Sequence, residues 1–185
     1  MPVVFMALAH WPVYNKNRQV IASALTTLDL HDLARLTATF GLAGFYVVTP
    51  LEDQHRLARD MVQHWRQGPG GAYNPDRAKA FDRVRLASDL DEMKNSIQSE
   101  TGVEPLLVAT SAASRADSAP LSDITALLNG PRPICLVFGT AWGLTDEAVD
   151  KCDIMMAPIE GPTDYNHLSV RSAAGIVLDR LLGRR

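Results

Sequence analysis

Two glycines follow a short apolar run near residue 139, at a place where backbone groups could meet a ligand. The segment from Phe138 to Glu147 (FGTAWGLTDE) contains Gly139 and Gly143, four residues apart. Because glycine has no Cβ, the chain can turn tightly there and present its N–H and C=O groups to a bound molecule. The alternative is an ordinary turn from a strand into a helix, with Thr145 as the helix cap.

A second segment, from Pro158 to Ser169 (PIEGPTDYNHLS), is rich in groups that donate or accept hydrogen bonds. Its backbone could surround an adenosine, with Tyr165 or Ile159 against the base. The alternative is an irregular connection that leads into a helix. Since an idle loop needs few directed polar groups, the composition favours a binding role.

A third set of candidates lies in the runs YNKN (14–17) and DLHDLAR (29–35). Asp32 and Arg35 are three residues apart, so on a helix they share a face and can form an ion pair. Taken alone, such a pair is a surface salt bridge. Gly41 follows Arg35 by six residues.

Short apolar runs alternate with helical patterns along almost the whole chain, and this alternation predicts the elements that position these residues. The expected strands are 3–9, 45–49, 84–87, 105–110, 134–139 and 154–159, and the expected helices are 29–41, 57–65, 88–102, 121–129, 145–152 and 168–182. Asp29 is the expected cap of the first helix, and residues 67–75 are an expected loop. Apolar strands separated by helices are typical of a parallel sheet covered on both faces. The sequence therefore predicts an α/β fold in a single domain, residues 1–185.

Ligands of such sheets bind beyond the carboxyl ends of the strands, so the residues that follow each strand are candidates for function. In this sequence they are His10–Pro12, Thr49–Pro50, Thr110–Ser111, Gly139–Thr140 and 158–166.

Several common kinds of site are absent from the sequence. It contains no ATPase-type phosphate loop, no Gly-x-Gly-x-x-Gly between a strand and a helix, and no Gly-x-Ser-x-Gly elbow. The five histidines and two cysteines lack the spacing of metal ligands, so no metal site is expected.

The composition indicates a globular protein of the cytoplasm. The chain is 46% hydrophobic and 21% charged, and its two cysteines are too few for a disulfide framework. No apolar run reaches the ~18 residues of a membrane span. No basic residue precedes the apolar start, so a signal peptide is not expected.

The net charge of −3 gives no overall attraction for nucleic acid, but one segment is basic. Between residues 55 and 85, seven lysines and arginines stand against three acids. A solvated helical face is the simpler interpretation. A patch that contacts RNA phosphates is the alternative, with Arg56, Arg59 and Arg77 as candidates.

Taken together, the segments YNKN, DLHDLAR, FGTAWGL and GPTDYNHLSVRSA resemble those of the SPOUT class of RNA methyltransferases over nearly the whole chain. The resemblance implies a deep trefoil knot in the last third of the chain, S-adenosylmethionine as the cofactor, a homodimer, and an RNA substrate (tRNA or rRNA). The implied cofactor pocket consists of Thr110, Ser111, Phe138, Gly139, Thr140, Trp142, Gly143, Ile159, Glu160, Gly161, Tyr165, Asn166, His167, Leu168 and Ser169.

The same resemblance assigns the reacting side of the site. Arg35 matches an arginine that assists catalysis or RNA binding in related enzymes, where a guanidinium can engage a phosphate or polarise the acceptor. His31, Asp32 or His167 could accept a proton, and Lys16 is a further candidate for RNA contact. Many related enzymes have Asn-x-Ser at residues 167–169, so His167 or the preceding Asn166 takes the place of that asparagine here.

Two other functions remain compatible with the sequence. One is a module that binds S-adenosylmethionine without catalysis, and the other is a dimeric partner protein whose loops bind no cofactor. With 185 residues there is little room for a separate RNA-binding domain, so a protein partner for RNA recognition is also possible.

Overall fold

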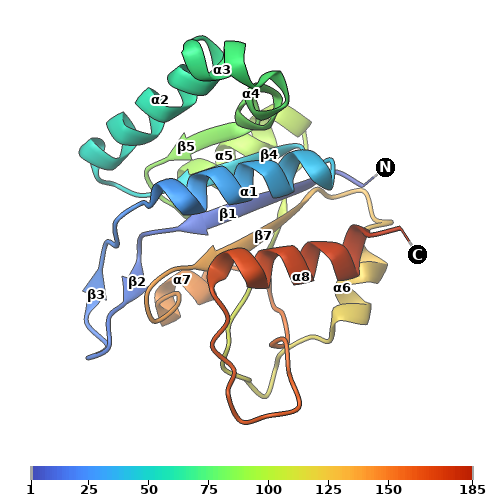
Figure 1. Cartoon of the computed structure of the whole chain (residues 1–185). Helices are drawn as coiled ribbons and strands as arrows, with labels where there is room; N and C mark the ends of the chain where they lie inside the picture. Colours follow the sequence, from blue (N-terminus) through green and yellow to red (C-terminus); the bar gives the residue numbers. More distant parts are fainter. Residues whose placement is uncertain (1, 185) are drawn as a thin grey trace.

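A six-residue strand at the centre of the molecule produces two hydrophobic layers because its side chains alternate between the two faces of the sheet. β1 (Val4–Ala9) sends Val4, Met6 and Leu8 to one face, and the side chains of residues 5, 7 and 9 to the other. All six are buried. The computed structural model, which describes residues 2–184, is therefore a sheet between two layers of helices (Figure 1).

β1 lies inside a six-stranded sheet in which every pairing is parallel. The strand order is β5-β4-β1-β7-β6-β8. The other strands are β4 (Gly44–Val48), β5 (Val84–Ala87), β6 (Leu106–Ala109), β7 (Ile134–Gly139) and β8 (Ile154–Met155). A parallel sheet with helices on both faces confirms the predicted fold class.

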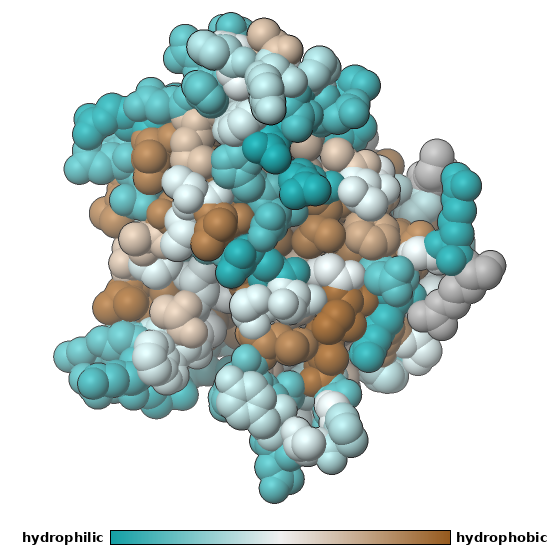
Figure 2. Space-filling view, in the orientation of Figure 1, coloured by the Kyte–Doolittle hydropathy of each residue, from teal (hydrophilic) through white to brown (hydrophobic). Residues whose placement is uncertain are grey.

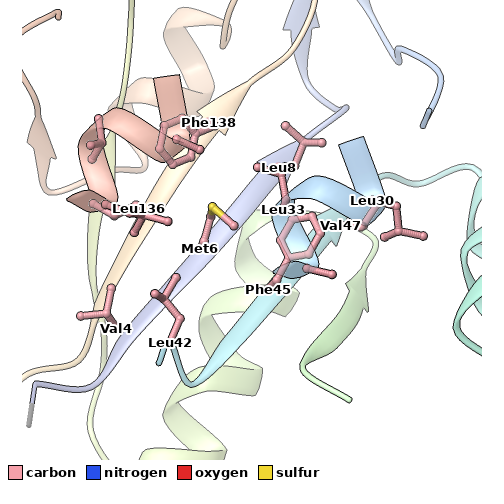
Figure 3. Close-up of a cluster of buried hydrophobic side chains, with 14 of the residues drawn as sticks. Val4, Met6, Leu8, Leu30, Leu33, Leu42, Phe45, Val47, Leu136 and Phe138 are labelled. Carbon is pink, nitrogen blue, oxygen red and sulfur yellow. The ribbon is translucent and has the colours of Figure 1, made fainter. Parts of the chain in front are cut away.

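The helices divide between the two faces. One face is covered by α1 (Thr27–Thr39), α2 (Glu52–Arg66), α4 (Pro75–Phe81), α6 (Leu121–Leu127) and α8 (Val170–Leu182), and the other by α5 (Leu90–Thr101) and α7 (Asp146–Asp150). Figure 3 shows Met6, Phe45 and Leu136 from three neighbouring strands beside Leu30 and Leu33 of α1. No helix within residues 2–184 is long and apolar enough to span a membrane.

A small hairpin projects from the carboxyl edge of the sheet. It consists of β2 (Val13–Tyr14) and β3 (Val20–Ile21), which pair antiparallel. In the sequence the hairpin lies between β1 and α1 (Figure 1). Arg18, at its turn, has a positive φ of 59°. The hairpin therefore carries Lys16 and Arg18 outward on the same edge as the strand ends.

Some element boundaries differ from the prediction. The cap of α1 is Thr26, whose side chain accepts a hydrogen bond from the Asp29 N–H, so the predicted cap at Asp29 is wrong. Part of the expected loop 67–75 forms the short helix α3 (Pro69–Tyr73), because a proline suits the first position of a helix. The closing helix begins after Ser169, which caps it, rather than at Leu168.

Replacing Thr26 with alanine should lower the free energy of unfolding by about 1 kcal/mol, because the N–H of Asp29 loses its side-chain acceptor. Urea unfolding measures the change. The neighbouring exposed Thr27 is the matched control, and Thr27→Ala should alter stability by less than about 0.5 kcal/mol. Equal losses in the two variants would contradict this assignment of the cap.

Candidate cofactor and substrate site

The centre of the carboxyl edge lies between the adjacent strands β1 and β7, where the strand order changes direction. β1 continues toward β4 and β5, whereas β7 borders β6 and β8. Such a point is where open α/β sheets bind their ligands. His10 follows β1, and Thr140 follows β7, with the Thr140 N–H donating to the carbonyl of Ala9 at 3.2 Å.

The turn after β7 is fixed by its own backbone and by the hairpin. The Gly143 N–H donates to the carbonyl of Thr140 at 2.9 Å, with positive φ angles at Ala141 (51°) and Gly143 (95°). Trp142 donates to the Tyr14 carbonyl at 3.0 Å, and the Tyr14 N–H donates to the Gly143 carbonyl at 2.9 Å. The turn is therefore held in place by three backbone hydrogen bonds, and Trp142 is 67% exposed on it.

Gly139 is required by this turn because the backbone of the following residues lies directly against it. A Cβ at residue 139 would lie 2.7 Å from the backbone nitrogen of Leu144 and 3.1 Å from the carbonyl carbon of Gly143. The absence of a side chain therefore allows the turn to fold back onto the end of β7. This agrees with the tight turn that the sequence predicts at the two glycines, and Thr145 caps α7 as the alternative interpretation expected.

The loops after β6 and β8 lie against each other. Asn166 donates its side-chain N–H to the carbonyl of Ala112 at 2.9 Å, and the rings of Tyr165 and His167 meet edge to face at 5.5 Å. Within residues 2–184, the backbone N–H groups of 159–168 have no protein acceptor. This exposed segment therefore offers unused donors to a ligand. Through the bond from Asn166 to Ala112 it meets the loop that begins at Thr110 and Ser111, which the resemblance assigns to the same cofactor pocket.

Asp146, at the start of α7, joins three segments that are far apart in the sequence. Its carboxylate accepts hydrogen bonds from the Tyr14 hydroxyl (3.1 Å), Arg18 (2.9 Å) and Arg115 (2.8 Å). The bond from Arg115, followed by that from Tyr14, lowers the pKa of Asp146 below its usual range. This cluster links the hairpin, the loop after β6 and the turn after β7. The sequence analysis did not identify it, because no spacing pattern relates residues 128 or 132 positions apart.

The three residues predicted to be catalytic lie on different sides of α1. Arg35 is exposed. The ring of His31 packs against Trp65 (5.2 Å between centroids) and Phe81 (4.9 Å), on the side of α1 that faces α2 and α4. Burial, and then the nearby Arg77, lower the pKa of His31.

Asp32 faces α8 and forms its ion pair there. Arg171 of α8 lies 3.1 Å from Asp32 and 3.2 Å from Asp29. The pair between Asp32 and Arg35 that the spacing allowed is not among the ion pairs of residues 2–184. Arg171 therefore ties the start of the closing helix to the helix that carries Arg35.

The arginines of the basic segment are largely engaged by the protein itself. Arg56 pairs with Asp53 at 2.6 Å, and Arg59 pairs with Glu52. Arg77 lies over the ring of Trp65, 4.6 Å from its centroid. Lys16, in contrast, is exposed on the hairpin. The local positive charge of α2 is thus partly neutralised by acids on the same helix.

His10 is the buried titratable group of this edge, with a side chain 1% exposed. Its Nδ1 lies 2.8 Å from the Ser23 hydroxyl, which lies 2.6 Å from the Thr140 hydroxyl. Burial lowers the pKa of His10 from 6.5 to about 4, and Asp29 partly opposes this shift. The imidazole is therefore neutral at physiological pH.

The lowered pKa of His10 predicts a loss of stability in acid. Between pH 6.5 and 4 the unfolded chain binds a proton that the folded chain does not, so stability falls as the pH is lowered, by about 3 kcal/mol from this group. Urea unfolding at pH 7.5 and pH 4.5 should show that His10→Asn removes most of this difference. The exposed His64 is the control, and an equally large effect of His64→Asn would contradict the assignment.

Gly139→Ala should lower the free energy of unfolding by about 1–3 kcal/mol, because the new methyl group displaces the backbone of Gly143 and Leu144. Gly175, inside α8, is a suitable control, since a Cβ there makes only ordinary contact with Leu36 at 3.9 Å. Gly175→Ala should leave stability unchanged or raise it. A wild-type unfolding midpoint for Gly139→Ala would show that the turn has room for a side chain.

Known proteins resemble this chain in fold and in sequence. A probable methyltransferase from Bordetella pertussis Tohama I superposes with a TM-score of 0.65 at 17% identity, covering 97% of this chain and 94% of that one. The SpoU methyltransferase AviRb from Streptomyces viridochromogenes, solved in complex with its cofactor AdoMet, gives a TM-score of 0.61 at 14% identity over 98% and 57%. At these identities the likeness concerns the fold alone.

The sequence relatives are closer. A tRNA (guanine-N(1)-)-methyltransferase of Nitratidesulfovibrio vulgaris is 46% identical over 97% of this chain, which spans 42% of that protein's length. Residues 3–183 match the model of a family described as SAM-dependent RNA methyltransferase. This match confirms the resemblance drawn from the sequence: the chain belongs to the S-adenosylmethionine-dependent RNA methyltransferase family of the SPOUT class.

Proposed function

We propose that this chain transfers the methyl group of S-adenosylmethionine to a nucleotide of tRNA in the cytoplasm. The observation that carries the proposal is the meeting of three loops, 110–118, 139–146 and 157–169, at the carboxyl edge of the sheet. The name of the sequence relative supports tRNA as the substrate. Because this chain spans 42% of that relative, the methylated atom is left to product analysis.

The loops suit the cofactor because they combine unused backbone donors with a rigid turn. The free N–H groups of 159–168 can bind its polar groups, and Tyr165, 73% exposed, can lie against the adenine. Bound S-adenosylmethionine supplies an activated methyl group on a sulfonium. The protein then needs to hold the acceptor in line with that group and to remove a proton from it.

The positions of the side chains suggest which residue performs each of these two tasks. Arg35, exposed on α1, binds a phosphate of the RNA or polarises the acceptor. Of the three candidate proton acceptors, His31 packs against Trp65 and Phe81, and Asp32 is paired with Arg171. His167 is exposed within the cofactor loop, and we favour it as the acceptor. Lys16, Arg56, Arg59 and Arg77 remain the proposed RNA contacts.

The proposed assembly is a single knotted domain, residues 1–185, that forms a homodimer. The knot is supported by the path of 157–169, whose Ala157 donates to Ala119 and whose Asn166 donates to Ala112 before the chain continues into α8. The dimer is supported by the hydrophobic residues that Figure 2 shows over the α1 and α8 face. In addition, Leu28 of α1 is 59% exposed. Sedimentation equilibrium would return twice the chain mass for the dimer and the chain mass for a monomer.

Arg35→Ala should lower methyl transfer to tRNA at least about tenfold, because a charged hydrogen bond to the acceptor is lost. Its affinity for S-adenosylhomocysteine, measured by isothermal titration, should remain that of the wild type. The exposed Arg180 on α8 provides a control, and Arg180→Ala should transfer methyl groups at the wild-type rate. Wild-type activity of Arg35→Ala would remove this residue from the reaction.

The same assays separate the alternatives. Saturable binding of S-adenosylhomocysteine without methyl incorporation into any RNA would favour a module that binds the cofactor and does not catalyse. The absence of binding at millimolar ligand would favour a partner protein. Either result would overturn the proposed function.

A further inference from the structure

A continuous chain of hydrogen bonds crosses the centre of the carboxyl edge, and the proposed reaction does not use it. It runs from the buried His10 ring through the Ser23 hydroxyl (2.8 Å) to the Thr140 hydroxyl (2.6 Å), and from there to the carbonyl of Ala9 (3.1 Å). Its members belong to the end of β1, the segment before α1 and the turn after β7. It therefore joins the part of the chain that leads to Arg35 with the expected cofactor turn.

The last acceptor fixes the direction of this chain. A backbone carbonyl has no proton, so the Thr140 hydroxyl donates to Ala9 and must accept from Ser23. The Ser23 hydroxyl then has no further proton to give, so its bond with His10 is satisfied only when Nδ1 is the donor. The imidazole is thus the neutral form with its proton on Nδ1.

Ser23 is also held by its backbone, because its N–H donates to the carbonyl of His10 at 2.8 Å. Both its hydroxyl and its main chain are therefore set by the residue that ends β1. The Thr140 hydroxyl already donates its one hydrogen bond to the carbonyl of Ala9. Its contribution to cofactor binding is consequently the placement of the turn rather than a donated hydrogen bond.

We propose that His10 is a positioning residue for the cofactor turn: it donates through Nδ1 to Ser23, which holds Thr140 and with it residues 140–143. The inference rests on the proposed cofactor site and adds residues outside it that determine its affinity. His10 acts through Ser23 and touches neither the cofactor nor the acceptor.

The test uses two variants that break the chain and one that preserves it. Ser23→Ala removes the middle hydroxyl, and His10→Leu removes the first donor. In His10→Asn the side-chain amide nitrogen stands at the position of Nδ1 and can donate to Ser23. Thr37→Val is the matched control, because it removes a buried hydroxyl that donates to Leu33 inside α1, away from the strand ends.

Ser23→Ala and His10→Leu should weaken the binding of S-adenosylhomocysteine about tenfold, the effect of one lost hydrogen bond on the placement of the turn. His10→Asn should bind within about threefold of the wild type, and Thr37→Val should bind like the wild type although its stability falls. Wild-type affinity in both breaking variants would overturn the inference.

Two measurements without ligand separate this inference from the proposed function. The ¹⁵N NMR shifts of the His10 ring should show its proton on Nδ1. Amide hydrogen exchange of Trp142 and Gly143 should be faster than in the wild type in Ser23→Ala but not in Thr37→Val. If wild-type protein binds no S-adenosylhomocysteine while these results hold, the proposed function fails and the positioning role stands. A proton on Nε2, or unchanged exchange in Ser23→Ala, would refute the positioning role.

Discussion

The parallel pairing of β1 with β7 is the constraint on which the rest of the molecule depends. It joins residues near the start of the chain to residues about 130 positions later, over six residue pairs from Val4 and Ile134 to Ala9 and Gly139. Both strands are almost fully buried, so the free energy of hydrophobic burial fixes their register. Once that register is set, His10 and Thr140 must emerge side by side, and the candidate site lies where they emerge.

Polar contacts at this edge fix the positions of the loops that follow the strands. Backbone bonds between Tyr14 and residues 142 and 143 attach the hairpin to the turn, and Asp146 attaches the hairpin to the loop after β6. Arg171 attaches α8 to α1 through Asp29 and Asp32. These contacts hold loops that have few apolar anchors of their own. A site made of such loops needs them, because loops without packed side chains open easily.

The sequence was sufficient for the features that depend on local pattern. Apolar runs such as ICLVFG and FYVVT correctly predicted buried strands, and their alternation with helices predicted a parallel sheet. The loops beyond the strand ends followed from a general property of such sheets. The pattern placed the α1 cap at Asp29, whereas the helix is capped by Thr26. Threonine and aspartate are both favourable cap residues, and the tertiary fold decides which of the two begins the helix.

Contacts between distant residues could not be read from the sequence. The ion pair of Asp32 was predicted with Arg35, its neighbour on the helix, and it forms with Arg171, 139 positions away. His31 packs against aromatic residues of α2 and α4. The backbone of Leu144 lies so close to Gly139 that it leaves no room for a side chain there. The proposed knot and the cofactor are expectations that came from the resemblance to a family, since no local pattern encodes either.

The central claim is that the loops after β6, β7 and β8 form one cofactor site. Amide hydrogen exchange of the whole chain, with and without saturating S-adenosylhomocysteine, tests it most directly. The account predicts slower exchange in 110–118, 139–146 and 157–169 together, with α2 to α4 unchanged. Protection confined to α2–α4, or absent from all three loops despite saturable binding, would contradict it.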